Sequence, residues 1–154
     1  MAAVTTNKLR ELLLKASGST PFSLLDDGIR FILIDTSYVP DKTHAFVDSI
    51  TGGTSKEIAG TGYSGGYGGT GRKLIGSKAV IARGDGTPAL DCADPTWTGA
   101  NFGTPGFLGV FKPNTSDADS PLLLVVALTS AATDGSDFTV QIPADGLLGL
   151  GDGA

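Results

Sequence analysis

The segment Ile29-Arg30-Phe31-Ile32-Leu33-Ile34 is apolar at every position except Arg30. Successive side chains of a strand point to opposite faces, so this segment has apolar side chains on both of them. A strand of this kind lies between two packed layers. The segment therefore predicts a central strand of a β-sandwich. Residues 122–128 form a second apolar stretch and are expected to be buried.

Further strands are expected where short apolar segments alternate with turn-forming residues. The turns are rich in Asp, Gly, Asn, Pro, Ser and Thr, as at residues 113–117, 133–136 and 143–146. Seven or eight short strands at this spacing predict a mainly β chain, an antiparallel β-sandwich of jelly-roll type. The expected additional strands are residues 72–83, 88–91, 106–112, 122–129, 138–142 and 146–150.

One short N-terminal α-helix is predicted over residues 7–16. Gly18 follows as a stop, within a connector at residues 18–21. A turn is expected at residues 26–28, and residues 44–50 are expected to contain one helical turn. Apolar residues recur at helical spacing, and a cap is available just before them: Leu9, Leu12, Leu13 and Ala16, preceded by Thr5, Thr6 and Asn7.

The composition indicates one compact domain over residues 1–154. Apolar residues make up 40% of the chain, which is too many for a disordered protein. The single cysteine, Cys92, cannot form an internal disulfide, and we expect it to be buried beside Trp97. The first residues lack the pattern of a signal peptide, and no apolar stretch has the length of a membrane span. The sequence predicts a soluble protein made in the cytoplasm.

Charge is divided unevenly along the chain. Residues 1–84 hold ten Lys/Arg and seven Asp/Glu, a net +3, whereas residues 85–154 hold one Lys and nine Asp, a net −8. An acidic pI of about 4.6 argues against general nucleic-acid binding, which needs clustered cations. The asymmetry either orients neighbouring copies in an assembly or reflects Asp residues in turns, and the second interpretation is favoured.

Two glycine-rich matches imitate nucleotide-binding motifs. Residues 60–65 fit the pattern G-x-G-x-x-G, but the glycines that follow cannot begin the helix that would hold a pyrophosphate. Residues 66–73 imitate a phosphate-binding loop, but Arg72 stands where Lys belongs, and neither Lys73 nor Leu74 after it is the Ser or Thr that would bind magnesium. Neither match predicts a nucleotide site, and we expect no cofactor.

Reactive residues are sparse. His44 is the only histidine, Cys92 is the only cysteine, and no serine lies in a nucleophile-elbow sequence. One His and one Cys are too few for the usual zinc sites. The carboxylate pairs 91/94 and 117/119 are of the type that binds calcium, but turn formation is the favoured role. The chain is expected to be neither an enzyme nor a metal protein.

The glycine-rich loop at residues 60–71 contains two tyrosines, and basic residues follow it without an acid between them. Aromatic side chains on such a loop anchor protein interfaces or stack on sugars. A solvated strand face is the alternative, and the two interpretations stay equally open. The candidate protein-interaction residues are Tyr63, Tyr67, Arg72 and Lys73, with Lys78 and Arg83 further along.

Four segments recur in this order in small virion proteins of tailed bacteriophages: Asn7–Leu13, Ser37–Asp41 with His44, Gly60–Tyr63 and Asp94–Trp97. Over residues 7–130 the chain resembles proteins of this group that decorate or cement the icosahedral head. It departs from them in the added glycines at residues 65–71 and in Gly106-Phe107-Leu108-Gly109, where a more aromatic, β-branched strand is expected.

The resemblance implies a non-enzymatic capsid decoration protein on the exterior of the virion. Its expected partners are the major capsid protein and further copies of itself, with no nucleic acid, membrane, cofactor or metal. Two alternatives remain. One is a β-sandwich of the tail or head surface that binds host glycans through Tyr63, Tyr67 or Trp97. The other is a structural component of the tail or of the head–tail connector.

Overall fold

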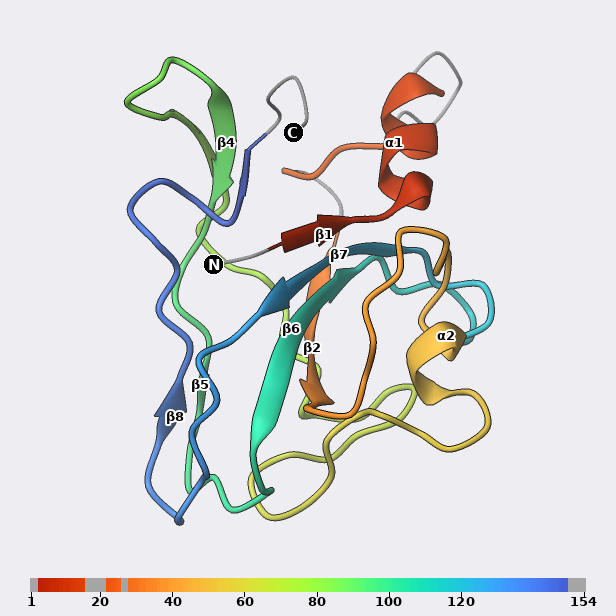
Figure 1. Cartoon of the computed structure of the whole chain (residues 1–154), viewed down its shortest axis with the longest axis vertical. Coiled ribbons are helices and arrows are strands. Elements are labelled where there is room, and N and C mark those ends of the chain that lie inside the picture. Colours follow the sequence, from red (N-terminus) through yellow and green to blue (C-terminus); the bar gives the residue numbers. More distant parts are fainter. Residues whose placement is uncertain (1–2, 16–21, 26–27, 150–154) are drawn as a thin grey trace.

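Figure 1 shows the computed structural model of the chain, which describes residues 3–15, 22–25 and 28–149. Its largest sheet is antiparallel, with the strand order β1-β7-β6-β2. These strands are Ala3–Thr5 (β1), Leu122–Ala127 (β7), Pro105–Phe111 (β6) and Arg30–Asp35 (β2).

Two smaller antiparallel sheets accompany the large one. The first, in the order β3-β4-β9, consists of Ala79–Ala82, Pro88–Asp91 and Leu148–Gly149. The second pairs β5 (Thr96–Trp97) with β8 (Phe138–Thr139). The helices are α1 (Asn7–Leu14) and α2 (Asp48–Thr51). The mainly antiparallel β fold with a short N-terminal helix is thus confirmed, and its strands do not close into a barrel.

The large sheet separates two apolar clusters, as the sequence of β2 predicts. Phe31 and Leu33 lie in the larger cluster, with Leu9 of α1 and residues of the two small sheets. Ile32 and Ile34 point the other way, into a cluster that includes Ile50 of α2. The period of two along this strand therefore places alternate side chains in different layers.

The expected position of β2 at the centre of its sheet is wrong, because β2 is the last strand in the order. Irregular segments cover its outer edge instead of a strand. Their backbone hydrogen bonds to β2 and its neighbour Ile29 are Phe31 N to Lys73 O, Ile75 N to Ile29 O, Ile58 N to Leu33 O and Asp35 N to Lys56 O, at 2.7–3.1 Å. The strand is buried as expected, but part of its cover comes from loops.

Several other boundaries differ from those expected. The strand predicted over residues 72–83 is only β3, since Ser77 has a left-handed φ of 51° that interrupts an extended chain. β1 and β5 were not predicted, because each has at most three residues. The helix is confirmed to Leu14, whereas Ala16, the connector at 18–21, Asp26-Asp27 and Leu150 lie outside the described residues.

Other predictions are confirmed. β4 matches its expected range, β7 is buried from Leu122 to Val126, and α2 supplies the helical turn near residue 50. Leu9 is fully buried, and Leu12 and Leu13 pack against the larger cluster. Neither described helix has the length and apolar character that crossing a membrane would require.

Thr6 fixes the start of α1 to the large sheet. Its buried hydroxyl accepts a hydrogen bond from Leu9 N at 3.2 Å and donates to Leu122 O at 2.6 Å. We expect Thr6→Ala to lower the free energy of unfolding by about 2 kcal/mol, because it removes the cap and leaves a buried carbonyl short of a donor. Thr6→Ser should retain most of the stability. Urea denaturation measures both, and equal midpoints for Thr6→Ala and the wild type would contradict this role.

Candidate functional site

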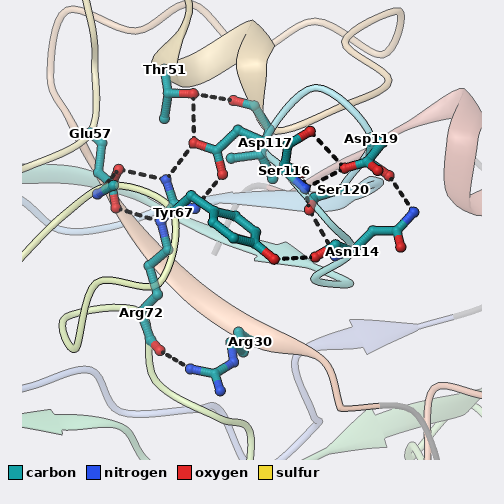
Figure 2. A network of polar contacts seen from close by, with 12 residues as sticks. Arg30, Thr51, Glu57, Tyr67, Arg72, Asn114, Ser116, Asp117, Asp119 and Ser120 are labelled. Carbon is teal, nitrogen blue, oxygen red and sulfur yellow. Dashed lines mark hydrogen bonds and ion pairs between the residues drawn. The ribbon is translucent and has the colours of Figure 1, made fainter.

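The most densely bonded polar group of the described chain is centred on Arg72 (Figure 2). Its guanidinium donates to both carboxylate oxygens of Glu57, from Nε to Oε1 at 2.8 Å and from Nη2 to Oε2 at 2.7 Å. It also donates to Asp117, from Nη1 to Oδ1 at 2.5 Å and from Nη2 to Oδ2 at 2.9 Å. The side chains of Arg72, Glu57 and Asp117 are 2%, 4% and 17% exposed. We call these three residues the arginine cluster.

Neighbouring donors complete the arginine cluster. Glu57 accepts from the hydroxyl of Tyr63 at 3.0 Å and from the backbone N–H of Gly66 at 2.9 Å. Asp117 accepts from the hydroxyl of Thr51 at 2.9 Å. Among the described residues, every buried side-chain nitrogen or oxygen has a hydrogen-bond partner. The cluster is therefore saturated, which is the condition under which a buried charge is tolerated.

The arginine cluster joins segments that are far apart in the sequence. Glu57 and Arg72 bracket the glycine-rich loop, and Asp117 belongs to the loop between β6 and β7. Thr51 is the last residue of α2, and the N–H of Asp48 at the start of α2 donates to the carbonyl of Asp117 at 3.1 Å. The guanidinium of Arg72 thus links the glycine-rich loop to the loop between β6 and β7, and Asp117 links that second loop to α2.

Tyr67 adds a second link between the same two loops. Its hydroxyl donates to the carbonyl of Asn114 at 2.5 Å (Figure 2), although the residue is 55% exposed. The loop that receives it is itself held by Asp119, which accepts from the N–H and hydroxyl of Ser116 at 2.6 and 2.8 Å. The exposed residue Tyr67 is therefore attached to a loop that hydrogen bonds hold in place.

Electrostatics favours the charged forms of Arg72 and Asp117. Burial alone would lower the pKa of Arg72, but its hydrogen bonds to Glu57 and Asp117 outweigh burial and raise it. The hydrogen bonds from Arg72 lower the pKa of Asp117 despite its partial burial. Burial, followed by the charge of Glu57, raises the pKa of Tyr63. Arg72 and Asp117 are therefore ionised, and Tyr63 is neutral, throughout the neutral pH range.

The placement of Tyr63 and Arg72 on an accessible contact surface is wrong, since they are only 2% and 3% exposed. Tyr63 lies in the larger apolar cluster, with its ring 5.7 Å from that of Phe102 and its hydroxyl accepting from Leu33 N at 3.1 Å. A tyrosine with both an apolar pocket and partners for its hydroxyl is more stable inside than on a loop surface. The glycine-rich loop folds back onto the body of the protein, so it brings Tyr63 inward.

Of the four predicted interaction residues, Tyr67 is exposed and Lys73 is half-buried, with its Nζ 5.8 Å from the ring centre of Trp97. Glu57 was not identified as a site residue, and Asp117 was considered only with Asp119, as a calcium-type pair whose favoured role was turn formation. Their distance from Arg72 in the sequence follows no motif, although Glu57 is one of only two glutamates in the chain.

The two reactive residue types are not brought together. Cys92 is buried in the larger apolar cluster, where burial, then Asp91 and Asp94, raises its pKa to about 11. Such a thiol is protonated and unreactive at neutral pH. His44 instead contacts Tyr38, with 2.6 Å between Nδ1 and the hydroxyl, beside the other cluster. Within the described residues, no group of three or more His, Cys, Asp or Glu is arranged to hold a metal ion.

The nucleotide-like motifs are turns, as expected. In the described part of the chain no helix follows residues 60–65, and Gly60, Gly62, Gly66 and Gly68 all have positive φ. A Cβ at Gly62 would lie 2.8 Å from the carbonyl oxygen of Thr98, so this glycine serves both a turn and a close approach. The loop conformation thus follows from its glycines.

Comparison with known proteins identifies no relative whose site could be compared with the arginine cluster. No protein-family model, no curated protein and no solved structure matched the chain.

Proposed function

We propose that this chain is a non-enzymatic structural protein of a tailed-phage virion. In this proposal it decorates the exterior of the head, binds the major capsid protein in many copies and stabilises the shell. The order of sequence segments at residues 7–13, 37–44, 60–63 and 94–97 motivates the proposal. The arginine cluster is the structural observation that supports it best.

The arginine cluster suits a contact protein because it makes a glycine-rich loop rigid. A loop that is ordered before binding loses little conformational entropy in the complex. The guanidinium of Arg72 and the carboxylate of Glu57 are buried and paired with each other, and the cluster fixes the loop that carries the exposed Tyr67. Rigid aromatic side chains are frequent anchors in protein interfaces. We therefore place a contact with the shell at Tyr67, with Lys73 beside the loop as a cation for acidic groups of the partner.

Many copies acting together explain how a small contact surface can stabilise a shell. Each copy that bridges neighbouring subunits adds buried area at a joint, and multivalent attachment raises the overall affinity beyond that of one contact. A weak individual interface is therefore sufficient for a large effect on the particle.

Particles that lack the protein are expected to assemble but to rupture more readily on heating or osmotic shock. Adding the purified protein back should restore their resistance, because it refills the joints. Release of packaged DNA, followed by nuclease sensitivity, measures rupture. Particles that are as robust without the protein, or density for the protein on the tail of the intact virion, would overturn the assignment to the head.

Tyr67→Ala is expected to lower the occupancy of the head at least about tenfold, the size of effect typical of an interface anchor. The free protein should stay folded, since Tyr67 is 55% exposed and lies outside both apolar clusters. Leu14→Ala is the matched control, because Leu14 is 86% exposed but lies on α1, at the other end of the molecule from residues 60–71 (Figure 1). Quantitative gel analysis of purified particles measures occupancy. Equal occupancy for Tyr67→Ala and Leu14→Ala would exclude the proposed contact, and selective binding of the free protein to a glycan array would favour the glycan-binding alternative.

A further inference from the structure

The surface around Tyr67 carries more negative charge than Arg72 neutralises. The arginine cluster contains one cation and two carboxylates, so its net charge is −1. Asp119, in the loop between β6 and β7, and Asp48, at the start of α2, each add −1 and bring the local charge to −3. A surface with this charge attracts cationic groups.

Hydrogen bonds connect Tyr67 with the segments that carry these carboxylates. Its hydroxyl donates to the carbonyl of Asn114 at 2.5 Å, and the side-chain amide of Asn114 donates to the carbonyl of Asp119 at 3.3 Å (Figure 2). The N–H of Asp48 donates to the carbonyl of Asp117 at 3.1 Å, two residues before Asp119. We call Tyr67, Asp48 and Asp119 the Tyr67 surface.

The two carboxylates of the Tyr67 surface have no cation within the described chain. Neither Asp48 nor Asp119 forms an ion pair there. Asp119 accepts hydrogen bonds from neutral groups, the N–H and hydroxyl of Ser116 at its Oδ1 and the hydroxyl of Thr115 at its Oδ2. These bonds, led by the one from Thr115, lower the pKa of Asp119, so its carboxylate is charged at neutral pH. Oδ2 of Asp119 keeps a second lone pair, and Asp48 is exposed, so both can bind a further donor.

The lysines that adjoin these segments in the sequence direct their ammonium groups elsewhere. Lys56 donates to the hydroxyl of Ser37 at 2.9 Å. The Nζ of Lys112 lies 5.5 Å from the ring centre of Phe22, which packs against the larger apolar cluster, whereas Ile50 of α2 lies in the other cluster. The charge of the Tyr67 surface is therefore available to a cation from outside.

An arginine side chain fits the Tyr67 surface best. The flat face of a guanidinium stacks on an aromatic ring while its N–H groups bond a carboxylate, whereas an ammonium is a single charge without a flat face. Charge-assisted hydrogen bonds of this kind are stronger than those between neutral groups. A metal ion fits less well, since no three His, Cys, Asp or Glu side chains of the described chain are arranged to hold one.

We propose that the partner protein presents an arginine to the Tyr67 surface. Its guanidinium stacks on Tyr67 and donates to Oδ2 of Asp119, and Asp48 adds attraction through space. This inference rests on the proposed function, because it names the chemistry of the shell at the contact assigned to Tyr67. Acidic groups of the partner that face Lys73 belong to another part of the contact, because its Nζ lies near Trp97 of the larger apolar cluster.

The test titrates purified protein onto particles that lack it and measures the affinity of attachment. The double variant Asp48→Asn, Asp119→Asn is expected to bind about fivefold more weakly, the combined effect of two exposed charge pairs, and to lose much of the sensitivity of the wild type to salt. Asp85→Asn is the matched control, because Asp85 is also exposed and bonded to a backbone N–H but lies in the turn between β3 and β4, far from α2 (Figure 1). Equal affinities for the double variant and Asp85→Asn would overturn the proposal.

Two controls separate the loss of charge from a disturbed loop. Hydrogen exchange at Gly66, whose N–H is bonded to Glu57, should be unchanged in the double variant. Should Asp119→Asn disturb the loop, Asp48→Lys alone is expected to weaken attachment about fivefold, because it repels the arginine while no described group bonds the carboxylate that it replaces. Wild-type affinity of Asp48→Lys would then overturn the proposal.

Substitutions of Tyr67 test the stacking. Tyr67→Phe keeps the aromatic face and loses the hydrogen bond to Asn114, whereas Tyr67→Leu loses both. Tyr67→Phe should therefore bind several-fold more tightly than Tyr67→Leu. Equal affinities of these two variants would show that no cation stacks on the ring, which contradicts the proposal.

The same titration separates this inference from the proposed function. If Tyr67→Ala binds as the wild type does, the contact assigned to Tyr67 fails, and this inference is overturned with it. If Tyr67→Ala binds weakly while the double variant matches Asp85→Asn, the contact stands and only the arginine is overturned. Sedimentation should show no dimer of the free protein that Asp48→Lys dissociates, because such a dimer would mean that a second copy supplies the cation.

Discussion

Arg72→Met is expected to lower the free energy of unfolding by about 3–5 kcal/mol, the usual effect of removing one partner of a buried ion pair. The loss exceeds the strength of any single hydrogen bond, because the substitution leaves the Glu57 carboxylate with a side chain only 4% exposed and without its cation. It also releases Asp117 and so loosens the loop between β6 and β7 from the glycine-rich loop. Urea denaturation monitored by circular dichroism measures the change.

Combining Arg72→Met with Glu57→Gln is the control for this interpretation. The double variant has no uncompensated charge at Glu57, while Asp117 can reach water because its side chain is 17% exposed. It should therefore be more stable than Arg72→Met alone, with a coupling of about 1–3 kcal/mol. Arg72→Lys should recover little, since an ammonium cannot bind two carboxylates in the geometry of a guanidinium. If Arg72→Met were as stable as the wild type, the arginine cluster would not hold the loops.

The arginine cluster also makes the stability of the folded protein depend on pH. Because Arg72 lowers the pKa of Asp117 in the folded protein, ionised Asp117 stabilises the fold. This contribution is complete above the ordinary aspartate pKa of about 4 and is lost as the pH falls through the lower pKa of the folded state. Asp117→Asn should consequently reduce the dependence of stability on pH below pH 4. An unchanged acid-unfolding profile would contradict the assignment.

The parts of the fold that were predictable are those whose pattern is local. The period of two at residues 30–34 and the caps and leucines of α1 act within one element, so the sequence shows them directly. The edge position of β2 was not predictable, because a strand covered by loop segments and one covered by strands have the same apolar pattern. Residues 56–58 and 73–75 provide that cover without any strand-like alternation of their own.

The arginine cluster was not predictable for a related reason. Arg72 was identified as a candidate, but as a surface cation, because a charged residue after a glycine-rich loop is normally solvated. Its burial depends on Glu57 and on Asp117, which is 45 residues away in the sequence. Only the folded loops bring these carboxylates to one guanidinium. The misplacement of Tyr63 has the same origin, since its pocket and the partners of its hydroxyl come from several segments.

Trp97 was expected to be buried near Cys92, and the structure confirms that it is buried. The residue is 1% exposed and belongs to the same apolar cluster as Cys92. Its indole Nε1 donates to the carbonyl of Gly71 at 2.7 Å, and its ring lies 6.1 Å from that of Phe138 on β8. Gly71 leaves no room for a side chain, because a Cβ at this position would lie 2.6 Å from the ring of Tyr63. Trp97 thus joins the small sheet β5-β8 to the end of the glycine-rich loop, one residue before Arg72.

Trp97→Ala is accordingly expected to lower the free energy of unfolding by about 3–5 kcal/mol, since it leaves a large cavity and an unpaired carbonyl at Gly71. Trp97→Phe keeps most of the apolar volume but loses the hydrogen bond, so its cost should be smaller, about 1–3 kcal/mol. Thermal and urea unfolding compare the three proteins, and the wild type should show the blue-shifted fluorescence of a buried indole.

Because Trp97 holds Gly71 next to Arg72, the Trp97→Ala variant should also show faster hydrogen exchange at Gly66, whose N–H is bonded to Glu57. Equal stability of Trp97→Ala and the wild type would contradict the packing role, whereas lost stability with unchanged exchange at Gly66 would separate Trp97 from the arginine cluster.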